Sequence, residues 1–135
     1  MTQLIIIGLI SWSVFLIAAL LLLRSMLVLT GKVAINEFSP YGSNLGEAHQ
    51  RYMRALYNSL ENLPILIGTL LTAVVMGMTD LSDQVASFIL LARMAQTIVH
   101  VISTSPIAVA ARVTFYVVQL GLCGYLLVQM AMAYI

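Results

Sequence analysis

Hydrophobic residues fall into four long runs along the chain, separated by short connections that are richer in polar residues. The first run is apolar from Leu4 to Leu23, which is about the length that crosses a bilayer, and no Lys or Arg precedes it. We therefore interpret it as a retained transmembrane helix and not as a signal peptide. The predicted helices cover about residues 3–29, 45–78, 84–102 and 106–134.

The connections between these runs are short, which favours antiparallel neighbours. The first, KVAINEFSPYGSN, is rich in turn-forming residues. The second, TDLSD, is acidic, and its Ser82 is a candidate N-cap for the third helix. Pro106 suits the first turn of the fourth helix. The predicted fold class is all-α integral membrane, a four-transmembrane-helix antiparallel bundle in one domain that covers residues 1–135.

A polar stripe follows one face of the second predicted helix. Its members are spaced four, three, four and three residues apart, which confines them to a sector roughly 80° wide. The stripe consists of Glu47, Arg51, Arg54, Asn58 and Glu61. Ionisable groups near lipid depth are costly and usually face a bundle interior or a water-filled cavity. This face of the helix is therefore a candidate site.

The third and fourth predicted helices carry similar stripes. These are Arg93, Gln96 and His100 in the third helix, and Arg112, Tyr116 and Gln119 in the fourth. An antiparallel bundle brings the three stripes toward the same end. Together they contain more arginines than acids, which suits an anionic ligand, because arginine grips carboxylates with two hydrogen bonds.

Structural interpretations of these charges stay open beside the functional one. Arg93 lies deep enough in its run to form an ion pair with Glu61, and such pairs also occur away from functional sites. Arg51, Arg54 and Arg112 lie nearer the membrane boundary, where arginines can extend toward lipid headgroups.

Composition supports the membrane interpretation and excludes several other classes. Hydrophobic residues make up 61% of the chain and charged residues only 8%, against about 25% charged residues in soluble domains. A net charge of +1, without a basic patch that contains aromatic residues, argues against a nucleic-acid partner. The single cysteine, Cys123, cannot form an intramolecular disulfide, and no metal-binding motif is evident.

Charge asymmetry predicts the orientation in the membrane. The connections between helices one and two and between three and four, with their flanks, are basic, whereas the remaining connection is acidic. The basic residues are Arg24, Lys32, Arg51, Arg54 and Arg112, and the acidic ones are Asp80 and Asp83. By the positive-inside rule, we expect the site to face the cytoplasm and both termini to lie on the opposite side.

The segment from Arg51 to Pro64, RYMRALYNSLENLP, resembles the signature of the MAPEG family, the membrane-associated proteins in eicosanoid and glutathione metabolism. The Arg93-to-His100 and Arg112-to-Tyr116 patterns agree with it. The resemblance implies a homotrimer of four-helix protomers, embedded among membrane lipids. It also implies that glutathione binds as co-substrate between subunits, and that a lipophilic electrophile or peroxide approaches from the membrane.

The resemblance implies roles for individual residues. Arg112 matches the arginine that stabilises the glutathione thiolate, which makes it the predicted catalytic residue. A neighbouring guanidinium favours the thiolate, and the thiolate is the nucleophile. The predicted glutathione-binding residues are Arg51, Arg54, Asn58, Glu61, His100 and Tyr116.

The chain departs from the pattern of glutathione-using members at Tyr57, where they commonly carry a basic residue. It departs from the prostaglandin E synthase branch at Ala34, Gln96 and His100, where that branch carries Arg, His and Tyr. Lys32 and Arg51 are candidate substitutes. The first hypothesis is a glutathione transferase or peroxidase. Two alternatives stay open: a non-catalytic lipid-binding or accessory protein on the same scaffold, and an ion or proton pathway that uses Glu61 and Arg93.

Overall fold

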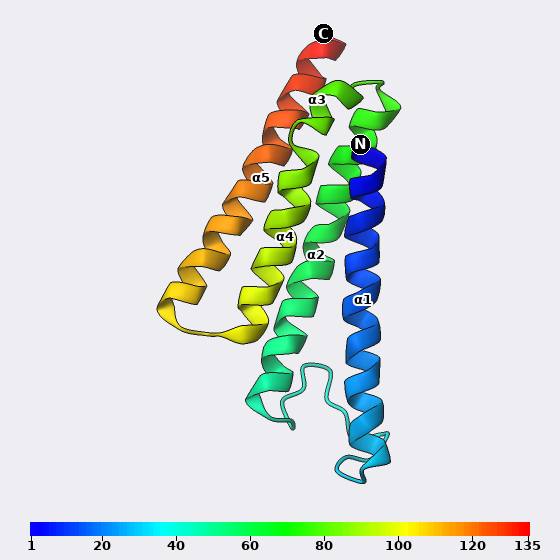
Figure 1. Ribbon diagram of the computed structural model, residues 1–135, viewed down its shortest axis with the longest axis vertical. Helices are drawn as coiled ribbons and strands as arrows, with labels where there is room; N and C mark the ends of the chain where they lie inside the picture. Colours follow the sequence, from blue (N-terminus) through cyan, green and yellow to red (C-terminus); the bar gives the residue numbers. More distant parts are fainter.

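The computed structural model describes residues 1–135, except for the side chain of Tyr134. Its long helices are α1 (Thr2–Leu29), α2 (Glu47–Val75), α4 (Ala86–Ile102) and α5 (Pro106–Tyr134), and a short helix, α3 (Thr79–Asp83), precedes α4. Consecutive long helices run antiparallel, and both termini lie at one end of the bundle (Figure 1). We call the other end, where the connections 30–46 and 103–105 lie, the basic end. The all-α antiparallel bundle predicted from the sequence is confirmed.

Two helices end on glycines with left-handed backbone conformation. Gly31, with a φ of 67°, follows α1, and Gly77, with a φ of 70°, follows α2. In each case the next amide closes the last turn: Lys32 N donates to Leu27 O, and Met78 N donates to Ala73 O. This is the usual glycine-terminated helix end, because glycine adopts a positive φ without a steric penalty. These ends define where the chain leaves the bundle.

The start of α5 agrees with the sequence analysis, whereas the start of α4 corrects it. Ser105 caps α5 by accepting a hydrogen bond from Ala108 N at 3.3 Å, and Pro106 occupies the first turn. Ser82 was expected to cap the third long helix, but that helix begins only at Ala86. The segment TDLSD forms α3 instead of a loop, and the Ser82 hydroxyl lies buried against Thr2 Oγ1 at 2.7 Å instead of capping α4.

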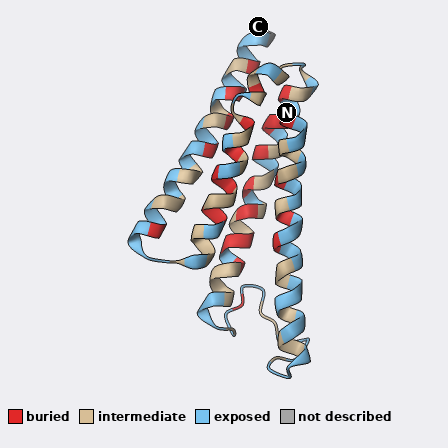
Figure 2. Cartoon of the chain, in the orientation of Figure 1, coloured by how far each residue is buried: buried red, intermediate tan, exposed pale blue. Residues whose placement is uncertain are grey.

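Burial divides the bundle into inner and outer faces. Buried residues follow the inner faces of α2 and α4, while much of α1 and α5 is exposed (Figure 2). The exposed side chains on α1 and α5 include large apolar ones such as Phe15, Leu22 and Val117. Such surfaces suit lipid rather than water. Three helices are long and apolar enough to cross a membrane (α1, α2 and α5), and α4, with 17 residues, is a shorter apolar helix.

The interior changes character along the bundle. Toward the termini it is an apolar cluster in which Leu9 of α1, Leu70 of α2, Ile89 of α4 and Leu126 of α5 are all fully buried. Nearer the basic end, buried polar side chains replace it, among them Arg93, Gln96 and Gln119. The apolar half fixes the helices in place, and the polar half carries the hydrogen-bonding groups of the candidate site.

Helix α1 is tied to α3 by a cluster of polar contacts at the terminal end. Asp83 Oδ1 accepts hydrogen bonds from Thr2 N at 2.6 Å and from Thr2 Oγ1 at 2.5 Å. Its Oδ2 lies 3.1 Å from the amino group of Met1. The hydroxyl and amide of Thr2, followed by the amino group, hold the pKa of Asp83 below its usual value. The carboxylate is therefore stabilised in its charged form.

Candidate functional site

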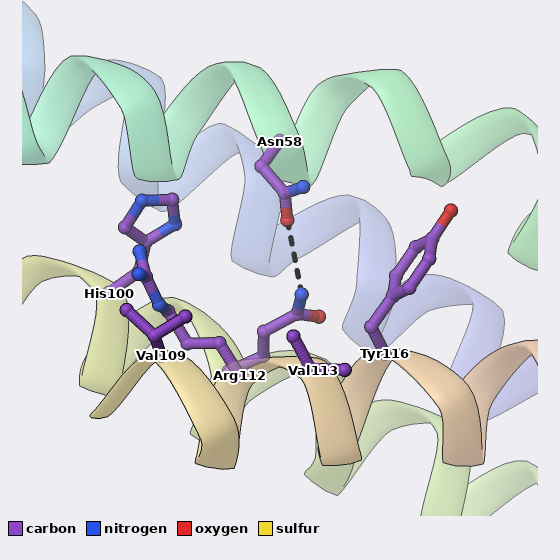
Figure 3. A pocket seen from close by; sticks show the side chains of 7 residues that line it. Asn58, His100, Val109, Arg112, Val113 and Tyr116 are labelled. Atoms are coloured by element: carbon purple, nitrogen blue, oxygen red, sulfur yellow. Dashed lines mark hydrogen bonds between the residues drawn. The ribbon is translucent and has the colours of Figure 1, made fainter. Parts of the chain in front are cut away.

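A cavity of about 220 Å³ lies between α2, α4 and α5 in the half of the bundle nearer the basic end. Figure 3 shows its lining side chains converging from the three helices. The lining residues are Asn58, Gln96, His100, Val109, Arg112, Val113 and Tyr116.

Helical spacing brings these side chains to one place. On α4, Gln96 and His100 are four residues apart, and on α5 Val109, Arg112 and Tyr116 follow at intervals of three and four. Residues at such intervals lie on one face of a helix. Asn58 closes the cavity from α2. The polar stripes predicted on three helices thus meet, at least in part, around one cavity.

A hydrogen-bond network beside the cavity fixes the side chain of Asn58. Its Oδ1 accepts from Arg93 Nη1 at 3.2 Å and from Gln96 Nε2 at 3.3 Å. Gln96 is held in turn, because its Oε1 accepts from Gln119 Nε2 at 2.9 Å. Two donors on one amide oxygen determine the orientation of the amide group. The Asn58 nitrogen, which donates no hydrogen bond within the described residues, is therefore available to a ligand.

Arg93 is the largest polar group in this network and is only 2% exposed. One of its nitrogens bonds to Asn58, while Nε and Nη2 have no hydrogen-bond partner among the described residues. No described carboxylate pairs with it. A buried cation with spare donors is costly unless something compensates its charge.

The expected ion pair between Glu61 and Arg93 is wrong for this protomer. Glu61 is exposed, and Arg93 bonds to Asn58 instead. The two α2 positions are about 60° apart around the helix axis, and α4 packs on the side of Asn58. The ion or proton pathway that would use Glu61 and Arg93 therefore gains no support, because the two side chains do not interact.

The structure brings together four of the seven predicted site residues. Asn58, His100, Arg112 and Tyr116 line the cavity, whereas Arg51, Arg54 and Glu61 do not. The first of these three turns away: Arg51 Nε donates to Val101 O at 3.2 Å, and its Nη1 lies 3.8 Å from Glu47 Oε2.

Arg54 and Glu61 are exposed on α2. Arg54 is nevertheless close enough to His100 for its charge to act on the imidazole, as the charge of Arg112 does. Arg54 and Glu61 each lie about one helical turn from Asn58 on α2, so they are beside the cavity and do not line it.

Sequence reasoning did not propose Val109 and Val113 as lining residues. Both are exposed as well as lining, so the cavity opens beside an apolar surface of α5. Their spacing from Arg112 and Tyr116 was the signal that could have found them. Valines in a membrane helix look like lipid-facing residues, and only the packing of α5 on α4 distinguishes them.

The family departures noted at Ala34 and Tyr57 lie away from the cavity. The Tyr57 hydroxyl donates to Pro40 O at 2.8 Å, and its ring meets Tyr41 edge-on with centroids 5.6 Å apart. Ala34 is exposed in the connection 30–46. Tyr57 contacts that connection and Ala34 belongs to it, whereas Gln96 and His100, the other two departures, line the cavity.

The cavity has a positive character. Arg112 lines it, and no acidic side chain does so. Arg112 forms no ion pair within the described residues, so its guanidinium is free to bind an anion. Hydrogen-bonding groups of Asn58, Gln96, His100 and Tyr116 surround it. This arrangement can bind a polar anion next to an apolar surface.

Sequence comparison agrees with this geometry, because the sequence model of the MAPEG family matches residues 9–132. The chain belongs to the MAPEG family. Comparison with curated proteins and with solved structures gives no significant match. Membership in the MAPEG family, together with the long apolar helices, makes this an integral membrane protein. It also relates the protein to eicosanoid and glutathione metabolism.

Proposed function

We propose that this MAPEG protein is a membrane-bound, glutathione-dependent transferase or peroxidase that acts on lipophilic electrophiles. The observation that carries the proposal is the position of Arg112, an unpaired guanidinium that faces a cavity without acidic side chains. A free thiol with a pKa near 8.5 is mostly protonated at neutral pH. Arg112 favours the thiolate, and the low polarity of a membrane site strengthens this effect.

The proposed reaction follows from that thiolate. In a transfer, the sulfur attacks the electrophilic carbon, a carbon–sulfur bond forms, and the leaving group departs with its electron pair. With a peroxide, the sulfur attacks one oxygen, the oxygen–oxygen bond breaks, and the other oxygen leaves with a proton as the alcohol. The thiol of a second glutathione then attacks the resulting sulfenic acid, so that the disulfide forms and water is released. The exposed valines at the cavity mouth, Val109 and Val113, suit an apolar substrate that arrives from the membrane.

The remaining polar groups would hold glutathione. The Asn58 amide nitrogen would donate to a ligand oxygen, while His100 and Tyr116 contribute further hydrogen bonds from opposite sides of the cavity (Figure 3). Arg54 and Glu61 have the charges that match a ligand carboxylate and a ligand ammonium, respectively. Arg51 turns away from the cavity toward Val101 and Glu47, so we give it no part in holding glutathione.

The small volume of the cavity in one protomer supports a homotrimer, in which a second subunit would complete the site. Its 220 Å³ is below the roughly 300–1,000 Å³ that is common for small-molecule sites. Arg54 and Glu61 are exposed on one protomer, beside the cavity and not inside it. In the proposed trimer, the neighbouring subunit covers this face of α2 and completes the cleft. The charge asymmetry further supports a cytoplasmic location for the basic end.

The test compares the parent with Arg112→Ala and Arg112→Lys in detergent or proteoliposomes. Glutathione should raise the melting midpoint of the parent, because a ligand of the folded state stabilises it by mass action. Arg112→Ala should lose conjugation of a generic aromatic electrophile by about 100-fold or more. Arg112→Lys, which keeps the charge, should retain more activity. Size-exclusion chromatography verifies that the variants keep the oligomeric state of the parent.

A full rate in Arg112→Ala would end the assignment of this residue. Absence of a glutathione effect in the parent would favour the second candidate, a non-catalytic lipid-binding or accessory protein. One observation supports that alternative: Arg93, Asn58, Gln96 and Gln119 bond to one another, as a structural network does. The alternative predicts that lipid copurifies in the clefts between subunits.

A further inference from the structure

A second hollow, with a volume of about 580 Å³, lies at the basic end of the bundle. It is bounded by the last turns of α1, the start of the connection 30–46, the first turns of α2 and Val101 near the end of α4. None of its lining residues lines the candidate site. Its size falls within the roughly 300–1,000 Å³ that is common for ligand pockets.

Apolar side chains form most of its wall, including Leu23, Leu27 and Ala48. Leu23 is also exposed, and so is the neighbouring lining residue Met26. The apolar wall is therefore continuous with the outer surface of α1. A hydrocarbon chain can enter from the surrounding lipid without crossing a polar layer.

The polar side chains of this hollow differ in whether they are already bonded. The Tyr52 hydroxyl donates to Leu16 O at 2.6 Å, and the Thr30 hydroxyl donates to Met26 O at 2.8 Å. Two polar groups remain without a partner. Lys32 forms no ion pair within the described residues, and the buried His49 Nε2 has no hydrogen-bond partner among them.

Another cation borders the same hollow. The side chain of Arg51 donates to Val101 O, so it reaches the place where α4 contributes to the wall. No acidic side chain lines the hollow. Arg51 is already paired with Glu47, so Lys32 is the cation that is left for a ligand. An apolar slot with a free lysine at its rim matches an anionic headgroup attached to an acyl chain.

We propose that this hollow binds an anionic phospholipid, with one acyl chain between α1 and α2 and the phosphate beside Lys32 and His49. The proposal does not depend on glutathione chemistry, because Lys32, considered above as a substitute glutathione contact, lines this hollow and not the candidate site. The lipid would fill the gap between the two helices and order the connection 30–46. A zwitterionic lipid fits less well, because its ammonium group would approach the same lysine.

The experiment measures lipid retention by native mass spectrometry, after purification from nanodiscs that contain phosphatidylglycerol and phosphatidylcholine with the same acyl chains. The parent should retain phosphatidylglycerol in preference. Lys32 is the only lysine in the chain and is exposed, so Lys32→Gln should fold normally. It should lower the preference for phosphatidylglycerol about fivefold.

A second variant tests the acyl slot. Ala48→Trp fills the hollow and should reduce retention of both lipids, whereas Ala131→Trp, at an exposed position near the other end of α5, should leave retention unchanged. Equal retention of the two lipids by the parent, or an unchanged preference in Lys32→Gln, would overturn the proposal.

Discussion

Arg93 and Asp83 show two ways in which this bundle holds a charge. Asp83, at the terminal end, is partly exposed and receives the hydroxyl and amide of Thr2 and the amino group of Met1. Arg93 is buried among neutral amides, and two of its nitrogens have no partner within the described residues. The carboxylate of Asp83 joins α3 to α1 and has its hydrogen bonds satisfied. The guanidinium of Arg93 keeps unused hydrogen-bond donors beside a cavity, at a cost to stability.

The largest expected effect comes from removing Arg93. Arg93→Ala should lower the free energy of unfolding by about 3–5 kcal/mol, because it opens a cavity and removes the hydrogen bond that Arg93 donates to Asn58. Arg93→Met keeps most of the volume and removes the uncompensated charge, so its stability should stay within about 1.5 kcal/mol of the parent. Unfolding in detergent micelles measures both. Equal losses in the two variants would show that the charge itself stabilises the fold.

A smaller effect is expected from the buried hydroxyl pair next to this network. Thr97 Oγ1 donates to Arg93 O at 2.9 Å, so Ser59 Oγ must be the donor in its 2.9 Å contact with Thr97. Ser59→Ala should cost about 1 kcal/mol, and Thr97→Val about 1–3 kcal/mol because it leaves the Ser59 donor unpaired. In a double-mutant cycle, the double variant should lose less than the sum. Strict additivity would mean that the two hydroxyls act independently.

The smallest effect concerns Asp83. Its pKa is lowered, so the folded chain binds a proton less readily than the unfolded chain. The stabilisation is present above the unfolded value of about 3.9, and it is lost as the pH falls through the lower folded value. The melting temperature of the parent should therefore decrease once the pH is lowered below about 4. Asp83→Asn should melt slightly lower at neutral pH and respond less to acid, and an unchanged acid response would assign the effect to another group.

The positions of the long helices could be predicted because apolar runs and helix-end residues are local signals. Ser105 and Pro106 mark the start of α5 in the sequence as they do in the fold. The approximate meeting of three polar stripes also follows from spacing and antiparallel order. For this reason Asn58, His100, Arg112 and Tyr116 could be proposed together before their cavity was known.

What could not be predicted depends on the rotation of each helix against its neighbours and on distant partners. A stripe about 80° wide contains both Asn58 and Glu61, but only packing decides which of them meets Arg93. Ser82 has the local sequence context of a helix cap, and its actual partner, Thr2, is 80 residues away, so the local sequence could not reveal that contact. Periodicity identifies a face of a helix, and it does not say which part of that face is buried.

The length of α4 has a consequence for access to the cavity. Its 17 residues extend about 26 Å, which is less than the roughly 30 Å of hydrocarbon in a typical bilayer, whereas α2 and α5 extend well beyond that thickness. A short helix among long ones draws the lipid boundary inward on its side. His100, in the last turn of α4, then sits where the membrane is locally thin. A water-soluble molecule therefore has less hydrocarbon to cross on that side. A lipophilic molecule can still approach along the apolar surface of α5.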